Sequence, residues 1–132
     1  MSEQASRVLI ADDDPDVRAV LTAQLAGRFD VVGAAADTDE AIALATDTRP
    51  DIAIVDVQMP GGGGLRATRE ICEATPETTI VALSADESER IVLDMLRAGA
   101  VAYVRKGVGA DELVALLEEA RRAHAKLPAE RP

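Results

Sequence analysis

The sequence predicts a single α/β domain in which helices cover both faces of a parallel sheet. Apolar runs too short for helices alternate along the chain with segments whose apolar residues recur at helical spacing. The runs begin 22, 22, 28 and 22 residues apart, close to the minimum for right-handed crossovers between parallel strands. A length of 132 residues suits one ordinary domain that buries a core without disulfides.

The five short apolar runs are candidates for buried strands, because a parallel strand covered on both faces is apolar along its whole length. They are RVLIA at 7–11, FDVVGAA at 29–35, DIAIVD at 51–56, TIVALS at 79–84 and VAYVR at 101–105. An amphipathic helix is expected after each run. The apolar positions of these helices are Val17, Val20, Leu21 and Leu25; Ala41, Ile42, Leu44 and Ala45; Leu65, Ile71 and Cys72; Ile91, Val92, Met95 and Leu96; Leu113, Leu116, Leu117 and Ala120.

Residues at the ends of the predicted helices agree with this alternation. Asp14 precedes a proline and supplies an N-cap side chain, so the first helix is expected to begin there. Asp37 and Glu40 have the spacing of a capping box for the second helix. Gly99 is expected to end the fourth helix, and Gly109 to open the last one.

Composition limits the classes of function. The chain has 24 acidic and 14 basic side chains, and this formal charge of -10 opposes binding to nucleic-acid phosphates and anionic membranes. Phe29 and Tyr103 are its only aromatic residues, so no surface for stacking bases or flavins is expected. One cysteine excludes a disulfide framework and thiolate zinc motifs. The sequence contains no signal-peptide or membrane-spanning pattern, which predicts a cytoplasmic protein.

Polar side chains follow the predicted strands at the edge where open parallel sheets bind ligands. Carboxylates a few ångströms apart repel by roughly 4 kcal/mol per pair at an effective dielectric near 20, so either one takes up a proton or a divalent cation binds. Oxygen ligands with room for waters suit Mg²⁺, and Mn²⁺ is expected to substitute. The side chains are Asp12, Asp13 and Asp14 after the first run, Asp56 after the third, Ser84 after the fourth and Lys106 after the fifth.

These groups match what phosphoryl transfer requires. A metal held by Asp12, Asp13 and Asp56 would attract a phosphoryl group, whose charge Lys106 and Ser84 would share. Because no Cys or His stands among them, the atom best placed to attack phosphorus is a carboxylate oxygen. Asp56 is the predicted nucleophile, since it stands alone at the end of a central strand and leaves the acidic pair to hold the metal.

Four segments carry a joint pattern: IADDDPDVR, IAIVDVQMPG with Gly64 eight residues beyond Asp56, IVALSA, and AGAVAYVRKG. Together they resemble the receiver domain of bacterial two-component response regulators. The last segment is similar to that of receivers joined to helix-turn-helix outputs, the NarL/LuxR subtype. The resemblance runs from about residue 7 to 122, and we expect a domain over 1–126 followed by a tail or linker at 127–132.

The resemblance implies a flavodoxin-like fold of five βα units in three layers, with strand order 2-1-3-4-5. It implies Mg²⁺-dependent transfer of a phosphoryl group to Asp56 from the phosphohistidine of a sensor histidine kinase or phosphotransfer protein. Asp13, Asp56 and the Gln58 backbone carbonyl would bind the metal directly, and Asp12 mainly through water. Such a domain is at most a weak enzyme, which phosphorylates itself and loses the group slowly, and is not a multiple-turnover metabolic enzyme.

The resemblance also implies how the domain changes state. Ser84 and Tyr103 would form a switch pair, in which the hydroxyl moves to the phosphoryl group while the ring turns inward. The added charge would reshape the surface of 91–98, 101–105 and 113–120, where a homodimer or a partner would dock. The fourth helix has more apolar positions than one buried stripe requires, which favours an interface there.

Two segments depart from the family pattern. Lys106 precedes Gly107 where many receivers have a proline in a cis peptide, so a cis bond is not expected here. The quartet at 61–64 replaces larger side chains with glycine, which predicts a flexible turn. Gln58 and Asp86 occupy positions that in the family tune the lifetime of the acyl phosphate.

Each candidate taken alone has an ordinary structural interpretation. The acidic run at 12–14 is typical of a solvated helix start favoured by the helix dipole. Ser84 alone would be a helix cap and Lys106 a surface cation, and both gain a functional interpretation from the set as a whole. His124 is expected to be solvated on the polar side of the last helix, and Cys72 to be a small core residue.

Other functions compete with a signalling switch. A haloacid dehalogenase phosphatase also uses an aspartyl nucleophile, Mg²⁺, Ser or Thr, and Lys, and Asp12-x-Asp14 mimics its motif. Against it, position 16 is Asp where that family has Thr or Val, and no cap domain fits. A flavodoxin-like cofactor carrier would place an anionic phosphate at the acidic first loop, which is electrostatically unfavourable. A receiver that binds proteins without being phosphorylated is the remaining alternative.

Overall fold

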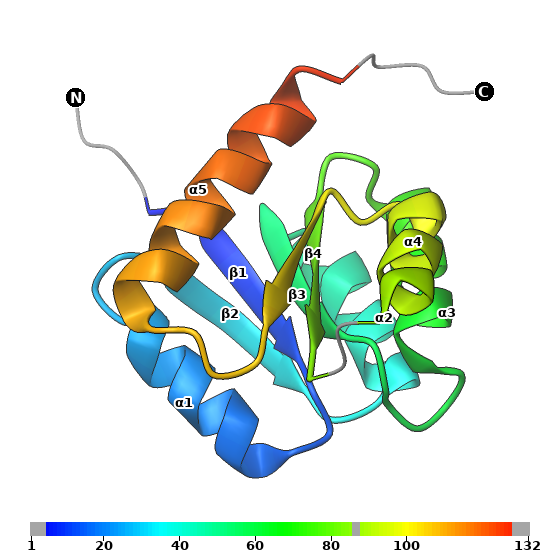
Figure 1. The fold of residues 1–132 in the computed structure, drawn as a ribbon, viewed down its shortest axis with the longest axis horizontal. Coiled ribbons are helices and arrows are strands. Elements are labelled where there is room, and N and C mark those ends of the chain that lie inside the picture. Colours follow the sequence, from blue (N-terminus) through cyan, green and yellow to red (C-terminus); the bar gives the residue numbers. More distant parts are fainter. Residues whose placement is uncertain (1–4, 86–87, 128–132) are drawn as a thin grey trace.

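The computed structural model describes residues 5–85 and 88–127. One five-stranded parallel sheet in the order β2-β1-β3-β4-β5 lies between two layers of helices (Figure 1). The strands are β1 (Arg7–Ala11), β2 (Asp30–Ala35), β3 (Ile52–Asp56), β4 (Thr79–Ser84) and β5 (Ala102–Arg105). The helices are α1 (Pro15–Leu25), α2 (Thr38–Thr48), α3 (Gly63–Ala74), α4 (Glu89–Ala98) and α5 (Ala110–Ala125). The predicted fold class, strand order and alternation of strands and helices are confirmed.

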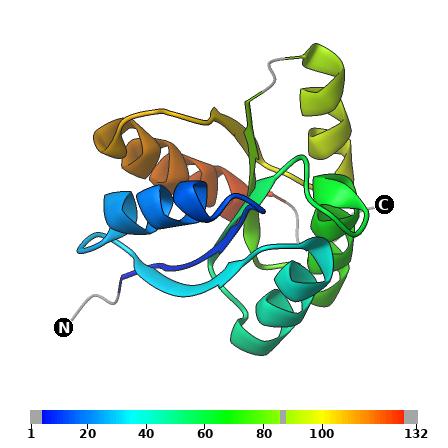
Figure 2. The same ribbon diagram turned by 90° about the horizontal axis from the view of Figure 1, so that it is seen from below.

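Two apolar clusters lie on opposite faces of the sheet, because successive side chains of a strand point to opposite sides. One face packs against α1 and α5, with leucines such as Leu25 and Leu117 fully buried. The other face packs against α2, α3 and α4, whose buried residues include Ala41, Ile71 and Met95. Figure 2 shows α1 and α5 together on one side of the sheet and the other three helices on the opposite side.

Side-chain caps fix where α1 and α2 begin, just beyond the carboxyl ends of β1 and β2. The Asp14 carboxylate accepts a hydrogen bond from the backbone N–H two residues later at 2.9 Å. The Asp37 carboxylate accepts from the Glu40 N–H at 2.8 Å, and the Glu40 carboxylate accepts from the Ala36 N–H at 2.7 Å. The predicted capping box thus extends to Ala36, the residue that precedes the N-cap Asp37. Gly99 ends α4 with φ of 129°, as predicted.

Strands β2, β3 and β5 each begin one residue later than predicted. Phe29 is buried against the α1/α5 cluster and forms an isolated bridge with Ala26 instead of starting β2. Asp51 precedes β3, and its carboxylate accepts from the Arg7 N–H at 2.8 Å. These residues therefore tie strand starts to their neighbours rather than extend the sheet.

The prediction of a solvated His124 is wrong. Its Nδ1 lies 2.8 Å from the Thr79 hydroxyl, because the C-terminal part of α5 packs over β4. Asp86 and residues 128–132 of the predicted tail lie outside the described residues. Within 5–85 and 88–127, no helix combines the length and the apolar character needed to cross a bilayer.

Candidate functional site

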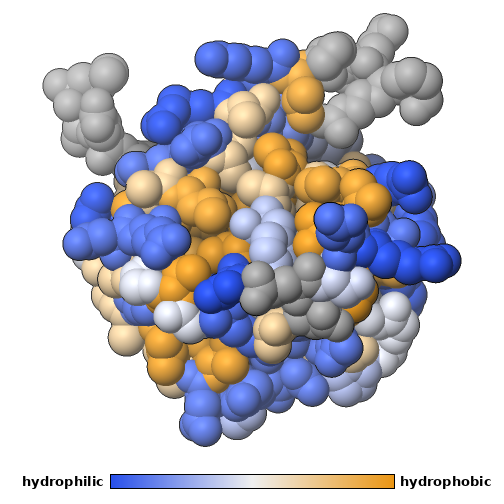
Figure 3. Space-filling view, in the orientation of Figure 1, coloured by the Kyte–Doolittle hydropathy of each residue, from blue (hydrophilic) through white to orange (hydrophobic). Residues whose placement is uncertain are grey.

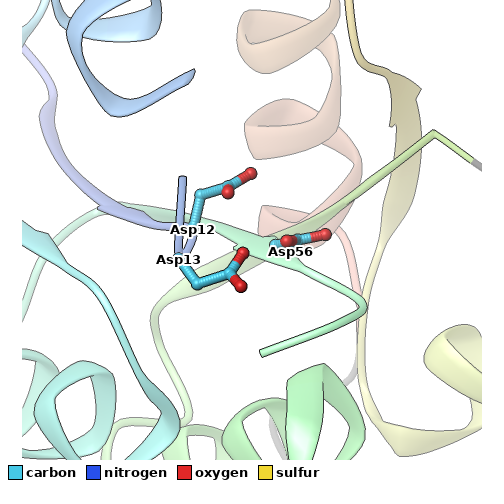
Figure 4. Close-up of side chains that lie close together, drawn as sticks. All are labelled: Asp12, Asp13 and Asp56. Atoms are coloured by element: carbon cyan, nitrogen blue, oxygen red, sulfur yellow. The ribbon is translucent and has the colours of Figure 1, made fainter. Parts of the chain in front are cut away.

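The carboxyl ends of two neighbouring strands bring three acidic side chains together. Asp12 and Asp13 follow β1, Asp56 ends β3, and these strands pair directly. One carboxylate oxygen from each residue lies within 4.8 Å of those from the other two (Figure 4). Asp12 and Asp56 are buried, whereas Asp13 is exposed. The acidic cluster expected at this edge is present, and it faces solvent on the side of Asp13.

Lys106 contacts the two buried carboxylates of this cluster. Its Nζ lies 3.0 Å from Oδ2 of Asp12 and 3.3 Å from Oδ2 of Asp56. Its backbone N–H donates to the Ser84 carbonyl at 3.1 Å, which fixes the loop after β5 to the end of β4. The contact with Asp12 is an ion pair rather than a well-directed hydrogen bond. The ammonium thus contacts two of the three carboxylates, and these four side chains carry more acidic than basic groups.

The surroundings of Asp56 disfavour its charged form. Burial raises the pKa of Asp56 above its ordinary value, and the charge of Asp12 raises it further. The Gln58 backbone N–H, 3.3 Å from Oδ1, and Lys106 lower the pKa but do not reverse the shift. Burial lowers the pKa of Lys106, but the contacts with the two carboxylates outweigh it and raise the pKa overall. Lys106 therefore stays protonated, while Asp56 favours a proton or a second cation nearby.

The three carboxylates fit a hard divalent cation. Their oxygens lie close enough to share one ion, and neither sulfur nor imidazole belongs to the set. Oδ2 of Asp12 is fully buried and makes no hydrogen bond with any described residue, so it has capacity for a further positive partner. The exposed side at Asp13 leaves room for the waters that Mg²⁺ retains in proteins. Asp12, Asp13 and Asp56 are the residues that would hold it.

Ser84 and Tyr103 lie on the same face of neighbouring strands. Tyr103 pairs with Ala82 in the register of β4 and β5, so Ser84 stands two residues further along on the same face. Ser84 is buried at the end of β4, next to β3 and Asp56, and Tyr103 packs half-buried against the cluster under α2, α3 and α4. This placement suits the predicted switch pair, whose movement stays a prediction.

The glycine quartet at 61–64 has a more specific structural role than that of a flexible turn. Its second half, Gly63 and Gly64, belongs to α3. A Cβ on Gly64 would lie 2.3 Å from the Asp56 carbonyl oxygen, closer than real Cβ atoms approach. The Gly64 N–H donates to the Val57 carbonyl at 2.8 Å, so α3 starts directly against the end of β3. Sequence reasoning missed this close approach, although the spacing of eight residues between Asp56 and Gly64 was a signal for it.

Three other predicted positions have different outcomes. Gln58 is exposed, and its backbone N–H contacts Asp56, whereas Asp86 lies outside the described residues, so the tuning role of both stays a prediction. Asp14 does not join the cluster, since its side chain caps α1 and is exposed. The two aspartates of the phosphatase motif therefore do not share one carboxylate cluster in this structure. No cis peptide bond occurs in the described chain, in agreement with the expectation after Lys106.

Comparison with known proteins identifies the family of this chain. Residues 8–118 match the family model of the response regulator receiver domain. The chain is 39% identical over 127 residues to the uncharacterized transcriptional regulatory protein YxjL of Bacillus subtilis strain 168, covering 95% of this chain and 58% of YxjL. It is 39% identical over 110 residues to the response regulator GacA of Pseudomonas viridiflava, covering 82% of this chain and 51% of GacA. The chain thus spans a little over half the length of these relatives.

Solved structures give the same result. A LuxR-family two-component response regulator from Aurantimonas sp. SI85-9A1 matches with a TM-score of 0.84 and 32% identity, over 91% of this chain and 87% of that one. The response regulator domain of Thermotoga maritima CheB matches with a TM-score of 0.78 and 30% identity, over 95% of this chain and all of that one (100%). The chain therefore belongs to the response regulator receiver domain family.

Proposed function

We propose that Asp56 accepts a phosphoryl group, in the presence of Mg²⁺, from the phosphohistidine of a sensor histidine kinase or phosphotransfer protein. The observation that carries this proposal is the meeting of Asp12, Asp13 and Asp56 with Lys106 at one edge of the sheet. Membership of the receiver family supports it, since the relatives named above include response regulators. We place this activity in the cytoplasm, in agreement with the composition.

The side chains at this edge divide the reaction among them. A carboxylate oxygen of Asp56 forms a bond to phosphorus while the bond from phosphorus to the donor imidazole nitrogen breaks, which leaves an acyl phosphate and a free imidazole. Lys106, already in contact with Oδ2 of Asp56, donates to the phosphoryl oxygens and offsets their charge. Asp12, Asp13 and Asp56 would hold Mg²⁺, which would supply further positive charge at this edge of the sheet. The Gln58 carbonyl is the proposed backbone ligand.

The response to phosphorylation is proposed for the face formed by α4, β5 and α5. A phosphoryl group on Asp56 adds about two negative charges beside β4, the strand that pairs with β3. Ser84 ends β4, and Tyr103 lies on the neighbouring strand β5, on the same face of the sheet. Leu93 and Leu96 of α4 are 47% and 40% exposed. Figure 3, which views this face, shows apolar atoms gathered between α5 and α4. This surface suits docking of a second copy or another protein.

Intact-mass measurement after incubation with Mg²⁺ and acetyl phosphate tests the proposal. Wild type should gain the mass of one phosphoryl group, and EDTA should prevent the gain. Asp56→Asn should gain nothing, whereas Asp14→Asn should behave as wild type, because Asp14 lies at the same edge but outside the cluster. Labelling that persists in Asp56→Asn would refute the assignment, and a wild type that is never labelled would favour a receiver that binds proteins without phosphorylation.

A second assay separates the switch from the phosphatase alternative. Turnover of p-nitrophenyl phosphate that is lost in Asp12→Asn but kept in Asp56→Asn would identify Asp12 as the nucleophile and overturn the proposal. We expect negligible turnover in all variants, since the two acids that the phosphatase motif requires are separated in function here: Asp12 is buried against Lys106, and Asp14 caps α1.

A further inference from the structure

The loop that follows Asp56 has little intrinsic preference for the path it takes. Gly61, Gly62 and Gly63 have φ of 94°, 113° and 77° in succession. Three consecutive glycines populate many backbone conformations in the unfolded chain, so ordering them has a large entropic cost. The same loop carries Gln58, whose N–H contacts the Asp56 carboxylate at 3.3 Å. Contacts from outside the loop must therefore select its conformation.

Thr38, the first residue of α2, contacts the loop at two points. Its backbone N–H donates to the Pro60 carbonyl at 3.0 Å, and its hydroxyl donates to the Gly63 carbonyl at 3.3 Å. Thr38 is fully buried, and a Cβ added to Gly61 would lie 3.3 Å from the Cβ of Thr38. The start of α2 therefore packs directly on this loop and binds the carbonyl groups on both sides of Gly61 and Gly62.

Arg66, in the first turns of α3, contacts the loop at a third point. Its Nη1 donates to the Gly61 carbonyl at 2.6 Å and lies 2.9 Å from the Asp39 carboxylate of α2. Its Nε donates to the Glu70 carboxylate at 2.7 Å, which orients the guanidinium. A Cβ on Gly62 would lie 2.8 Å from Cδ of Arg66, so the glycine leaves room for the arginine stem. The planar guanidinium thereby joins the loop to both helices.

We propose that Arg66 and Thr38 are positioning residues for the cation site, acting through the loop that carries Gln58. This inference rests on the proposed Mg²⁺ site at Asp12, Asp13 and Asp56, to which neither residue contributes a ligand oxygen. With the loop held in one path, a bound cation meets a preformed backbone beside Asp56. Without these contacts the loop samples other paths, and binding has to restore its order, which lowers the affinity.

Titration of MgCl₂ alone into the full chain, followed by calorimetry and by backbone amide NMR, tests this role. Arg66→Ala should weaken Mg²⁺ binding by about threefold to tenfold, less than the roughly ten- to hundredfold loss for groups that touch a metal ligand directly. Arg66→Lys should restore part of the affinity, because an ammonium keeps the charge but not the planar fork. Arg69→Ala is the matched control, an exposed arginine on the same helix whose loss should leave the affinity unchanged.

Thr38 and the loop amides provide independent checks. Thr38→Ser keeps the hydroxyl and should retain wild-type affinity, whereas Thr38→Ala should bind more weakly. Hydrogen exchange at the Gly64 amide, which donates to the Val57 carbonyl, should be faster in Arg66→Ala than in Arg69→Ala. These measurements read the loop itself, and a change in global stability alone does not reproduce them.

The outcomes separate this inference from the function on which it rests. If wild type binds Mg²⁺ and Arg66→Ala binds it equally tightly, the positioning role is refuted while the cation site stands. A lower melting temperature in Arg66→Ala with unchanged Mg²⁺ affinity would assign the residue to stability alone and also refute the role. If wild type binds no Mg²⁺ at millimolar concentration, the cation site and the inference built on it both fail.

Discussion

The two edges of the sheet use the same kinds of charged side chain in opposite ways. At the carboxyl edge, Asp12, Asp13 and Asp56 form one cluster, and the two buried carboxylates, Asp12 and Asp56, contact Lys106. At the amino edge, the half-buried Asp51 accepts from the Arg7 N–H at 2.8 Å and pairs with an arginine of α5 at 3.1 Å. The fold pairs Asp51 with a cation at the amino edge and leaves an excess of negative charge at the carboxyl edge.

The amino edge joins elements that are far apart in the chain. The Arg7 guanidinium donates to the carbonyls of Thr48 and Arg49 at 2.7 and 3.2 Å, and Arg121 bonds Ser6 as well as Asp51. These contacts tie β1, α2, the start of β3 and α5 together. Acids that are paired within the fold stabilise it, whereas the acids that the fold leaves in excess are available for chemistry.

Removal of Lys106 should have the largest effect on stability. Lys106→Ala leaves Asp12 and Asp56 buried without their cation, and we expect a loss of about 2 kcal/mol in metal-free buffer at pH 7. The side chain of Lys106 is 26% exposed, so the full cost of breaking a buried pair is not expected. Urea denaturation in EDTA measures this loss, and saturating Mg²⁺ should recover part of it. A loss that Mg²⁺ leaves unchanged would contradict a cation site at these carboxylates.

Neutralising one acid at each edge should change stability in opposite directions. The pKa of Asp56 is raised above 3.8, so the ionised carboxylate opposes folding at neutral pH. Asp56→Asn should therefore stabilise the metal-free chain at pH 7, by roughly 1 kcal/mol from reduced repulsion. The stability that protonated Asp56 contributes is fully present below 3.8 and lost as the pH rises through its raised value. The advantage of Asn should accordingly shrink as the pH falls from 7 toward 4.

The matched substitution at the amino edge sharpens this test. Asp51→Asn removes the charge that pairs with Arg121 and should lower stability by up to about 1 kcal/mol at pH 7. Urea denaturation of both variants in EDTA, side by side, gives the comparison. If both substitutions destabilise the chain, the excess charge at the carboxyl edge is balanced by the fold after all.

Removal of the cation at the amino edge should have the smallest effect. The side chain of Arg121 is 46% exposed, so Arg121→Ala should cost only about 0.5 kcal/mol, and less at high salt. The Mg²⁺ affinity should remain that of wild type, because the contact lies at the opposite edge from the cluster. Denaturation at two salt concentrations and a Mg²⁺ titration check both points. An altered Mg²⁺ affinity would mean that the edges are coupled through the sheet.

The order of the elements and the residues gathered at the carboxyl edge follow from local sequence patterns. Short apolar runs and helical spacing are local patterns, and caps such as Asp14 and Asp37 act on backbone groups two or three residues away. In a parallel sheet the carboxyl ends of all strands lie at the same edge, so Asp12, Asp56 and Lys106 could be placed together without coordinates. Their joint spacing also carried the family resemblance, which the match of residues 8–118 to the receiver family model confirms.

The side chains that support that edge depend on how the helices pack against the sheet. Thr38 meets Gly63 across 25 residues and His124 meets Thr79 across 45, contacts that depend on how each helix docks on the sheet. Helical periodicity gives the face a helix buries but neither its tilt nor its shift along the sheet, which select the partner of a polar side chain. For this reason the glycine quartet was predicted as a flexible turn, and its contacts with α2 and Arg66 emerged only from the packed structure.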